Sequence, residues 1–402
     1  MKRLLALLLC LALLLPVFSL AEDEEEDIDL FGEEDVDVDI DENGNLKLAD
    51  PENDASDYEL SDEFMEQMAD LFTADDSVDP DDLWINENLP DDEWINILLI
   101  GLDVKGTSKN KLLKDQDQYA KRADVQMILS INQIDGSIKL TSIARNTYVD
   151  IPDRTYDSSI CNSWGHGLYK NGKYVGWKNT PEMCLATVNK NFEMNIQYYV
   201  AINFYGVVSI IEDLGGADVE LTKEEASYIN SYLKKHKKAI SSTYDDKKGD
   251  RKELDVVDGV QHLDGLQALM YARTRELDNA LGRTGRTRKL LNSILSPTII
   301  KIKNRELDLE NLVLNEVPTY LKTNMNGQTI VRIIQIVLKS DLVKNLDAAD
   351  MLIEEYRLPE DGAWGYGEDH YGNSVVRLSN KQEATEHLHE FIYGAYYPSD
   401  RY

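Results

Sequence analysis

The acidic residues of this chain are concentrated in one segment near the N-terminus, which restricts where a folded core can form. Residues 22–93 contain 32 Asp or Glu residues and one lysine, within a chain whose formal net charge is −32. Stretches such as EDEEEDIDLFGEEDVDVDIDENG hold too few large apolar side chains to offset the conformational entropy lost on ordering. We therefore predict a disordered acidic linker over residues 22–90, with one transient helix near residues 61–72, and a folded body over residues 91–394.

The first 21 residues have the pattern of a secretory signal peptide. Lys2 and Arg3 precede an apolar run from Leu4 to Leu15, and a small-x-small cleavage sequence ends at Ala21. Retention of the segment as a membrane anchor is the alternative, because its apolar part is at the lower edge of the length that spans a bilayer. Either interpretation places the body outside the cytoplasm, at the outer face of the cell membrane or in the cell wall.

Export also affects how the cysteines are interpreted. Apart from Cys10 in the signal segment, the chain contains only Cys161 and Cys184. Two thiols of one domain often pair in an oxidising compartment, so we predict a structural disulfide between them. Closing a loop of this size stabilises a fold by roughly 3 kcal/mol in the chain-entropy model. Two buried free thiols are the alternative.

The hydrophobic periodicity of the body predicts an α/β fold with a central mixed β-sheet flanked by helices. Short apolar runs indicate strands at 95–100, 125–131, 138–143, 198–203 and 374–378, and Asp135-Gly136 is a hairpin turn signal between the second and third. Helical spacing covers 180–191, 205–214 and 263–271. This order of elements is typical of one sheet covered by helices.

Charged side chains follow or precede several of these strands. Asp103 comes after the first strand, Arg122 and Asp124 stand at the start of the second, and Arg145 with Asn146 ends the third. Five arginines then lie within sixteen residues of one another: Arg273, Arg275, Arg283, Arg286 and Arg288. Guanidinium groups remain protonated and match the oxygens of phosphate or pyrophosphate. The pattern predicts an anion site, although pairing of these arginines with nearby acidic residues is the alternative.

Several segments, in order, resemble the LytR-CpsA-Psr family of exocytoplasmic enzymes. They are NILLIGLD, RADVQMILSIN, LTSIARNTYVDIP, ICNSWGHG, YYVAINFYGVVSIIEDLGGADVEL, LDGLQALMYARTR and GRTGRTRK, and the likeness covers roughly residues 94–393. The resemblance implies a bacterial protein of the Gram-positive type that transfers an anionic glycopolymer from a polyprenyl pyrophosphate carrier to peptidoglycan. It also implies action at a membrane surface.

The resemblance implies roles for individual positions. Asp103 and Asp124 match the acidic pair that holds Mg²⁺ against the pyrophosphate. The residues that match the pyrophosphate-binding arginines, or stand beside them, are Arg122, Arg145, Arg273, Arg275, Arg283 and Arg286. We expect Arg145, Asp124, Arg283 and Asp278 to act in catalysis, with Asp124 and Asp278 as the two candidates for the general base.

Two departures from the family pattern leave other functions open. The family's S-I-P-R-D segment is Ser142-Ile143-Ala144-Arg145-Asn146 here, and an amide does not act as a general base. Ala280 stands where the family has an aspartate before Arg283. A carrier-binding regulatory module and a pyrophosphate hydrolase are therefore alternatives to the transferase. Nucleic acid is not an expected partner, because the exported body is close to neutral and lacks a broad basic face.

Overall fold

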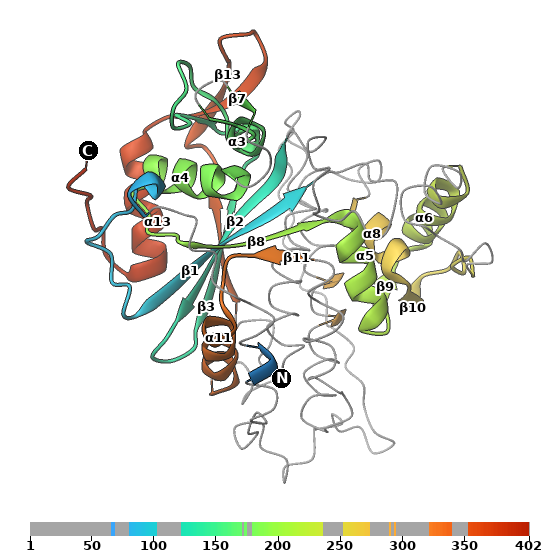
Figure 1. The fold of residues 1–402 in the computed structure, drawn as a ribbon. Coiled ribbons are helices and arrows are strands. Elements are labelled where there is room, and N and C mark those ends of the chain that lie inside the picture. The colour runs from blue at the N-terminus through green and yellow to red at the C-terminus, as the bar shows by residue number, and fades with distance from the viewer. Residues whose placement is uncertain are drawn as a thin grey trace.

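A six-stranded mixed sheet forms the centre of the molecule (Figure 1). The structure is a computed structural model, and it describes residues 66–68, 80–102, 122–170, 173–174, 179–235, 252–273, 289–290, 293–294, 321–339 and 353–401. The sheet has the order β11-β8-β1-β2-β3-β12. Its strands are β1 (Trp94–Leu102), β2 (Ala123–Asn132), β3 (Ile138–Ile143), β8 (Tyr198–Asn203), β11 (Leu321–Thr323) and β12 (Ile353–Leu358).

The pairing of the strands brings four carboxyl ends to one edge of the sheet. β1 pairs parallel with β8, and β12 pairs parallel with β3. β2 runs antiparallel to both β1 and β3, so β2 begins at the edge where its neighbours end. Leu102 of β1 is opposite Ala123 of β2 and Asn203 of β8. This carboxyl edge is where the polar residues after the strands are held together.

Alternating side chains of the strands divide the core into two layers. Ile95, Ile97 and Leu99 of β1 belong to one buried cluster, and Leu98, Ile100 and Leu102 belong to the other. The helices that contribute apolar residues to the first layer include α5 (Phe204–Asp213), α8 (Gly265–Arg273) and α11 (Gly327–Lys339). Three others contribute to the second: α3 (Ser163–Gly167), α4 (Thr180–Phe192) and α13 (Lys381–Tyr393). The described chain is thus a helix–sheet–helix sandwich, which confirms the predicted fold class.

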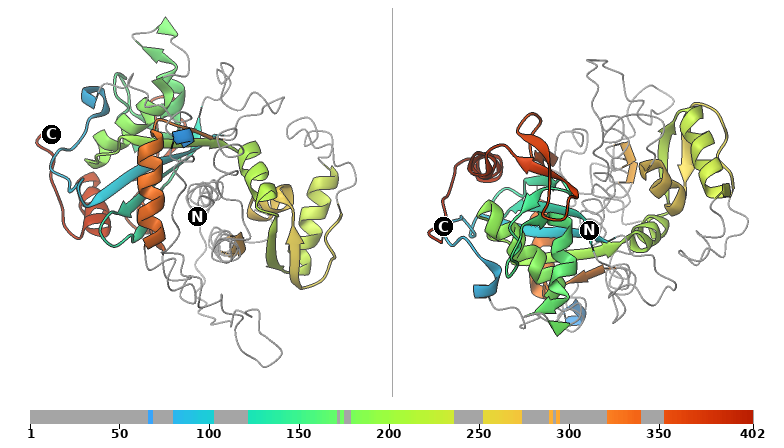
Figure 2. Two further views of the ribbon diagram at one scale, coloured as in Figure 1. Left: turned by 60° about the horizontal axis from the view of Figure 1, so that its bottom comes forward. Right: turned by 90° about the horizontal axis from the view of Figure 1, so that it is seen from above.

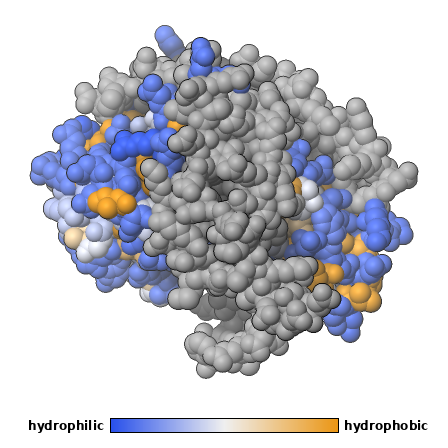
Figure 3. All heavy atoms as spheres, turned by 90° about the horizontal axis from the view of Figure 1, so that it is seen from below, coloured by the Kyte–Doolittle hydropathy of each residue, from blue (hydrophilic) through white to orange (hydrophobic). Residues whose placement is uncertain are grey.

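Smaller elements surround this sandwich. A lobe of α6 (Lys223–Lys235) and the antiparallel pair β9 (Ala217–Leu221) and β10 (Gly259–Leu263) lies beyond α5 and α8 (Figures 1 and 2). At the other side lie β4 (Tyr148–Val149), β5 (Ser158–Ser159), the 3-10 turns η3 (Pro80–Leu83) and η6 (Ile160–Asn162), β6 (Tyr169–Lys170), β7 (Lys173–Tyr174), and the hairpin of β13 (Trp364–Glu368) and β14 (Ser374–Leu378). Seen from below, the described surface is mainly hydrophilic with small separate hydrophobic groups (Figure 3).

The helix predicted at residues 263–271 begins later than expected. Leu263 is instead the last residue of β10, and it pairs with Ala217. Asp264 caps the helix, because its Oδ1 accepts hydrogen bonds from the backbone N–H groups of Leu266 and Gln267 at 3.0 and 2.9 Å. The helix is packed closely from its first residue, since a Cβ added at Gly265 would lie 2.1 Å from the carbonyl oxygen of Val208.

Residues just before position 91 belong to the folded body. Leu83, Ile85 and Leu89 are buried, and Asn189 donates from its side chain to the carbonyl of Leu83. Further upstream, residues 66–68 are helical and Met68 is fully buried in the core. The folded part of the chain therefore starts before residue 91. The predicted signal segment and the other residues of the predicted linker lie outside the described residues. None of the described helices has both the length and the apolar character needed to cross a bilayer.

Candidate functional site

Asp124 and Arg145 form an ion pair at the carboxyl edge of the sheet. An Nη1–Oδ1 distance of 3.2 Å joins them, and the exposed fractions of the side chains are 29% for Arg145 and 11% for Asp124. Asp124 is the second residue of β2, and Arg145 follows the end of β3. Because β2 and β3 are antiparallel neighbours, the first residues of one strand lie beside the last residues of the other. The sheet therefore brings together two residues that the sequence analysis singled out.

Arg122 belongs to the same electrostatic environment. Burial raises the pKa of the Cys161 thiol to about 11, and Arg145, Asp124 and Arg122 all act on this thiol, with the two arginines opposing the rise. Cys161 also donates its backbone N–H to the carbonyl of Arg145 at 3.2 Å. The half-buried Arg145, the buried Asp124 and the exposed Arg122, which directly precedes β2, thus share the end of the sheet where the strands β1 and β3 finish.

Asn146 holds the arginine rather than providing a base. Its Oδ1 accepts a hydrogen bond from Nε of Arg145 at 3.3 Å, and its carbonyl accepts from the backbone N–H of Val376 at 2.9 Å. The amide therefore orients the guanidinium group while Asp124 compensates its charge. The two contacts use Nε and Nη1 of Arg145, and neither uses Nη2. An arginine held in this way can present a donor to an anion.

A buried glutamine of β2, which the sequence analysis missed, binds η6 and the start of α3. Gln126 of β2 is buried, and its Nε2 donates to the carbonyl of Ile160 and to Oγ of Ser163, at 3.0 Å each. These bonds fasten η6 and the start of α3 to the strand that carries Asp124. A glutamine inside an apolar strand is a detectable signal, because a buried amide must find partners.

The two cysteines are free thiols, so the predicted disulfide is not formed in this structure. Both are buried: Cys161 is in η6 beside Arg145, and Cys184 of α4 has its Sγ 3.2 Å from Oγ of Ser163. Burial raises the pKa of Cys184 to about 12. Cys184 packs in the second apolar layer, and both residues are the buried free thiols of the alternative interpretation.

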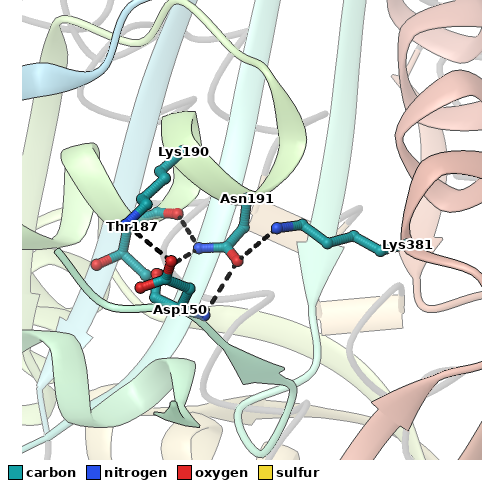
Figure 4. Close-up of polar contacts among 5 residues, drawn as sticks. All are labelled: Asp150, Thr187, Lys190, Asn191 and Lys381. Atoms are coloured by element: carbon teal, nitrogen blue, oxygen red, sulfur yellow. Dashed lines mark hydrogen bonds and ion pairs between the residues drawn. The ribbon is translucent and has the colours of Figure 1, made fainter. Parts of the chain in front are cut away.

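A second polar cluster fixes the segment that follows Arg145. The buried Asn191 of α4 binds both backbone groups of Asp150: Nδ2 donates to its carbonyl at 2.7 Å, and Oδ1 accepts from its N–H at 3.1 Å (Figure 4). Nδ2 also donates to the carbonyl of Thr187, and Oδ1 also accepts from Nζ of Lys381. Lys190 pairs with Asp150 at 2.8 Å. We call this group the Asn191 clamp; it joins α4, α13 and the segment after β4.

The helix α5 starts at the same edge as the ion pair. Asn203, the last residue of β8, caps α5 by accepting a hydrogen bond from the N–H of Gly206 at 2.9 Å. It lies opposite Leu102, which in turn lies opposite Ala123. The N-terminus of a helix carries a partial positive charge and free N–H groups. The N-terminus of α5 lies two strands away from Asp124 and adds partial positive charge to this edge of the sheet.

Other predicted site residues are not placed by the structure. Arg273 is the last residue of α8, which packs on α5, and its side chain lies outside the described part of the chain. Asp103, Arg275, Asp278, Arg283 and Arg286 all lie outside the described residues. Within the described ranges, no group of three or more His, Cys, Asp or Glu side chains could hold a metal ion. Of the predicted site residues, the structure therefore pairs Asp124 with Arg145 and places Arg122 at the same edge of the sheet.

The fold and these residues define an α/β protein with an acid–arginine pair and a helix N-terminus at the carboxyl edge of a mixed sheet. The sequence model of the LytR_cpsA_psr family matches residues 62–386, and the chain belongs to this family.

The sequence identity to individual relatives is low. The chain is 25% identical over 272 residues to the polyisoprenyl-teichoic acid–peptidoglycan teichoic acid transferase TagU of Bacillus mycoides, covering 67% of this chain and 70% of TagU. It is 27% identical over 211 residues to the transferase TagT of Bacillus subtilis. This match covers 52% of this chain and about half, 55%, of TagT. The crystal structure of B. subtilis TagT has 20% identity and a TM-score of 0.46, over 77% of this chain and 96% of TagT.

Proposed function

We propose that this protein transfers an anionic glycopolymer from a polyprenyl pyrophosphate carrier to peptidoglycan, outside the cytoplasm. The observation that carries the proposal is the Asp124–Arg145 pair at the carboxyl edge of the sheet, in a member of the LytR_cpsA_psr family. Relatives of this chain are named as teichoic acid transferases that use polyisoprenyl-linked donors and peptidoglycan. The export signal predicted at residues 1–21 agrees with such a location.

In the proposed reaction, a hydroxyl group of the acceptor attacks the phosphorus atom nearest the glycan. A new O–P bond forms, the bridging P–O bond breaks, and polyprenyl phosphate leaves with the electron pair. Negative charge grows on the oxygens of both phosphates, and arginines stabilise it at a site shielded from water. Arg145, held by Asp124 and Asn146, is the described residue suited to this role. Arg122, Arg273, Arg275, Arg283 and Arg286 are the further arginines that we propose for it.

Magnesium fits the chemistry of the donor set. Mg²⁺ prefers oxygen ligands, keeps several waters, and binds through one or two carboxylates plus the phosphates of a substrate. Asp124 provides a carboxylate beside Arg145, and we propose Asp103 as its partner. When bound, the ion would neutralise charge on the pyrophosphate. Asn146 does not take the proton of the attacking hydroxyl, so we assign that role to Asp124 or Asp278.

A transfer assay tests the proposal. The full-length protein is mixed with lipid-linked glycopolymer, Mg²⁺ and peptidoglycan, and polymer joined to peptidoglycan is measured. We expect Arg145→Ala to lower the rate about 100-fold or more, since removal of one donor to a developing oxyanion has that effect. Arg332→Ala is the matched control, because Arg332 is an exposed arginine on α11. Equal rates for wild type and Arg145→Ala would contradict the assignment.

The replacement of the family's aspartate by Asn146 favours a second candidate, a module that binds the carrier without transferring the glycan. The same assay separates the candidates. Tight binding of the donor with no joined polymer and no released phosphate indicates the module, whereas phosphate release without joining indicates a hydrolase. Joined polymer that depends on Arg145 indicates the transferase.

A further inference from the structure

Three aromatic rings form an exposed platform on the side of the hairpin β13–β14. Tyr156 stacks on His370 with ring centroids 3.8 Å apart and an interplanar angle of 7°. The ring of Tyr371 meets His370 edge to face, with centroids 5.1 Å apart. Tyr156 is 50% exposed and Tyr371 is 79% exposed. We call Tyr156, His370 and Tyr371 the aromatic platform; its rings come from two segments distant in the sequence.

The turn that carries two of these rings is held in one conformation although it lies at the surface. Oδ1 of Asp369 accepts from the backbone N–H groups of Tyr371 and Asn373, and Oδ2 accepts from Nδ2 of Asn373, all at 2.8 Å. Gly372 supplies the positive φ of 80° that the turn requires. The side-chain and backbone hydrogen bonds around Asn373 lower the pKa of Asp369, so the carboxylate stays charged and the turn stays closed. Rings held in advance lose little entropy when a ligand binds.

The platform is connected directly to the candidate site. The backbone N–H of Val376 in β14 donates to the carbonyl of Asn146 at 2.9 Å, and Thr147 forms a parallel bridge with Val376. The guanidinium carbon of Arg377 lies 4.2 Å from the centroid of the Tyr148 ring. The hairpin therefore packs on the residues that directly follow Arg145, and it extends from the sheet beyond the end of β12 (Figure 1).

The charges next to the platform select against an anionic ligand. Asp157 follows Tyr156, and Glu368 and Asp369 precede His370. Two arginines close in the sequence use donors within the protein: Nη2 of Arg377 donates to the carbonyl of Glu368, and Nη2 of Arg154 donates to the carbonyl of His166. Aromatic faces bind the C–H faces of sugar rings, whereas the acidic flank repels a phosphate-bearing polymer.

We propose that the aromatic platform binds the glycan of the peptidoglycan acceptor and positions it beside the Arg145 site. The identity of the acceptor rests on the function proposed above. Sugar rings stacked on Tyr371 and on the Tyr156–His370 pair would lie against the hairpin that is bonded to Asn146, which places the acceptor on the β3–β12 side of the site. The anionic donor then binds at Arg145, and the acceptor reaches it from the side of the hairpin.

Binding of the full-length protein to peptidoglycan stripped of its attached polymers tests the platform. We expect the double variant His370→Ala/Tyr371→Ala to bind about tenfold more weakly, and Tyr371→Phe to bind like wild type because the ring is kept. Ile134→Ala is the control: Ile134 is 76% exposed in the turn between β2 and β3, at the opposite edge of the sheet. Thermal unfolding midpoints of these variants should match wild type, since the altered side chains are exposed.

The outcomes separate this inference from the proposed function. Equal binding by wild type and the double variant overturns the platform, as does the absence of binding by wild type or displacement of peptidoglycan by free anionic polymer. Arg145→Ala should bind stripped peptidoglycan like wild type while losing transfer. If wild type transfers nothing yet its binding still depends on His370 and Tyr371, the platform stands and the transferase proposal fails.

Discussion

At the scale of single residues, burial determines the state of the two cysteines. Burial raises the pKa of Cys161 to about 11 and that of Cys184 to about 12, so each thiol is protonated and shielded. We predict that, in a Cys10→Ser background, neither thiol reacts with Ellman's reagent at about pH 8 until denaturant is added. Both should then react. Rapid reaction of the native protein would contradict the burial, and no reaction after unfolding would show that the exported protein forms the disulfide.

His166 gives the folded state a dependence on pH. Burial, reinforced by Arg154, lowers its pKa to about 4, whereas the ordinary value is 6.5. The unfolded chain therefore takes up a proton at a higher pH than the folded chain, and stability falls as the pH drops from about 6.5 to about 4. Because part of the ring is in contact with solvent, we expect a loss of roughly 1 kcal/mol rather than the full value of the shift.

A comparison of wild type with His166→Gln isolates this effect. Asp91 titrates in an overlapping range, since burial raises its pKa to about 6, but its contribution is common to both proteins. Urea unfolding measured at several pH values should show that wild type loses stability relative to the variant over this window. Parallel pH profiles for the two proteins would contradict the assignment to His166.

At the scale of elements, the Asn191 clamp is expected to stabilise the segment after Arg145. Replacement of the buried Asn191 by leucine leaves both partly buried backbone groups of Asp150, and the amine of Lys381, without this partner (Figure 4). Buried polar groups left unpaired cost about 1–3 kcal/mol each, so we predict a loss of roughly 3 kcal/mol in the free energy of unfolding. Urea denaturation measures it. Lys190→Met removes the partly exposed pair with Asp150 and the contact of its amine with the Trp84 ring, and it should cost about 1–2 kcal/mol at most. Equal losses in the two variants would contradict the role of the clamp.

Elements with strong local signals could be predicted from the sequence. The strand at residues 198–203 has the predicted bounds, as does the strand at residues 374–378. The hairpin between β2 and β3 turns at Gly136, whose φ of 74° explains the Asp-Gly signal. The β9–β10 pair was missed, although β9 alternates regularly between buried and exposed residues. Pairing between distant segments supplies such strands with their stability, and local periodicity does not report it.

The candidate site, too, could be predicted only in part from the sequence. The Asp124–Arg145 pair could have been predicted, because in a hairpin the start of the first strand lies beside the end of the second strand. The contact of Asn146 with Val376 and the stacking of Tyr156 on His370 depend on where β12 and the following hairpin join the sheet. β12 was not predicted, and its parallel pairing with β3 is set by packing of the whole sheet.

At the scale of the whole molecule, the start of the folded body can be tested by truncation. Residues 80–90 contribute Leu83, Ile85 and Leu89 to the interior, and full burial of each such side chain stabilises a fold by about 1.5–3 kcal/mol. The same residues hold the C-terminal end: Nδ2 of Asn86 donates to the carbonyls of Glu193 and Tyr397, and Nδ2 of Asn88 donates to the carbonyl of Pro398.

We therefore predict that a chain beginning at residue 62 unfolds at the same temperature as the full-length protein, whereas a chain beginning at residue 91 loses at least about 5 kcal/mol or fails to fold. Circular dichroism and thermal unfolding distinguish the two. Because residues 22–61 carry many of the acidic side chains, the truncation at 62 also changes the net charge, so a deletion of residues 22–41 alone serves as a charge control. Equal midpoints for the chains starting at 62 and 91 would mean that residues 80–90 are dispensable, and that the buried apolar side chains there add little to stability.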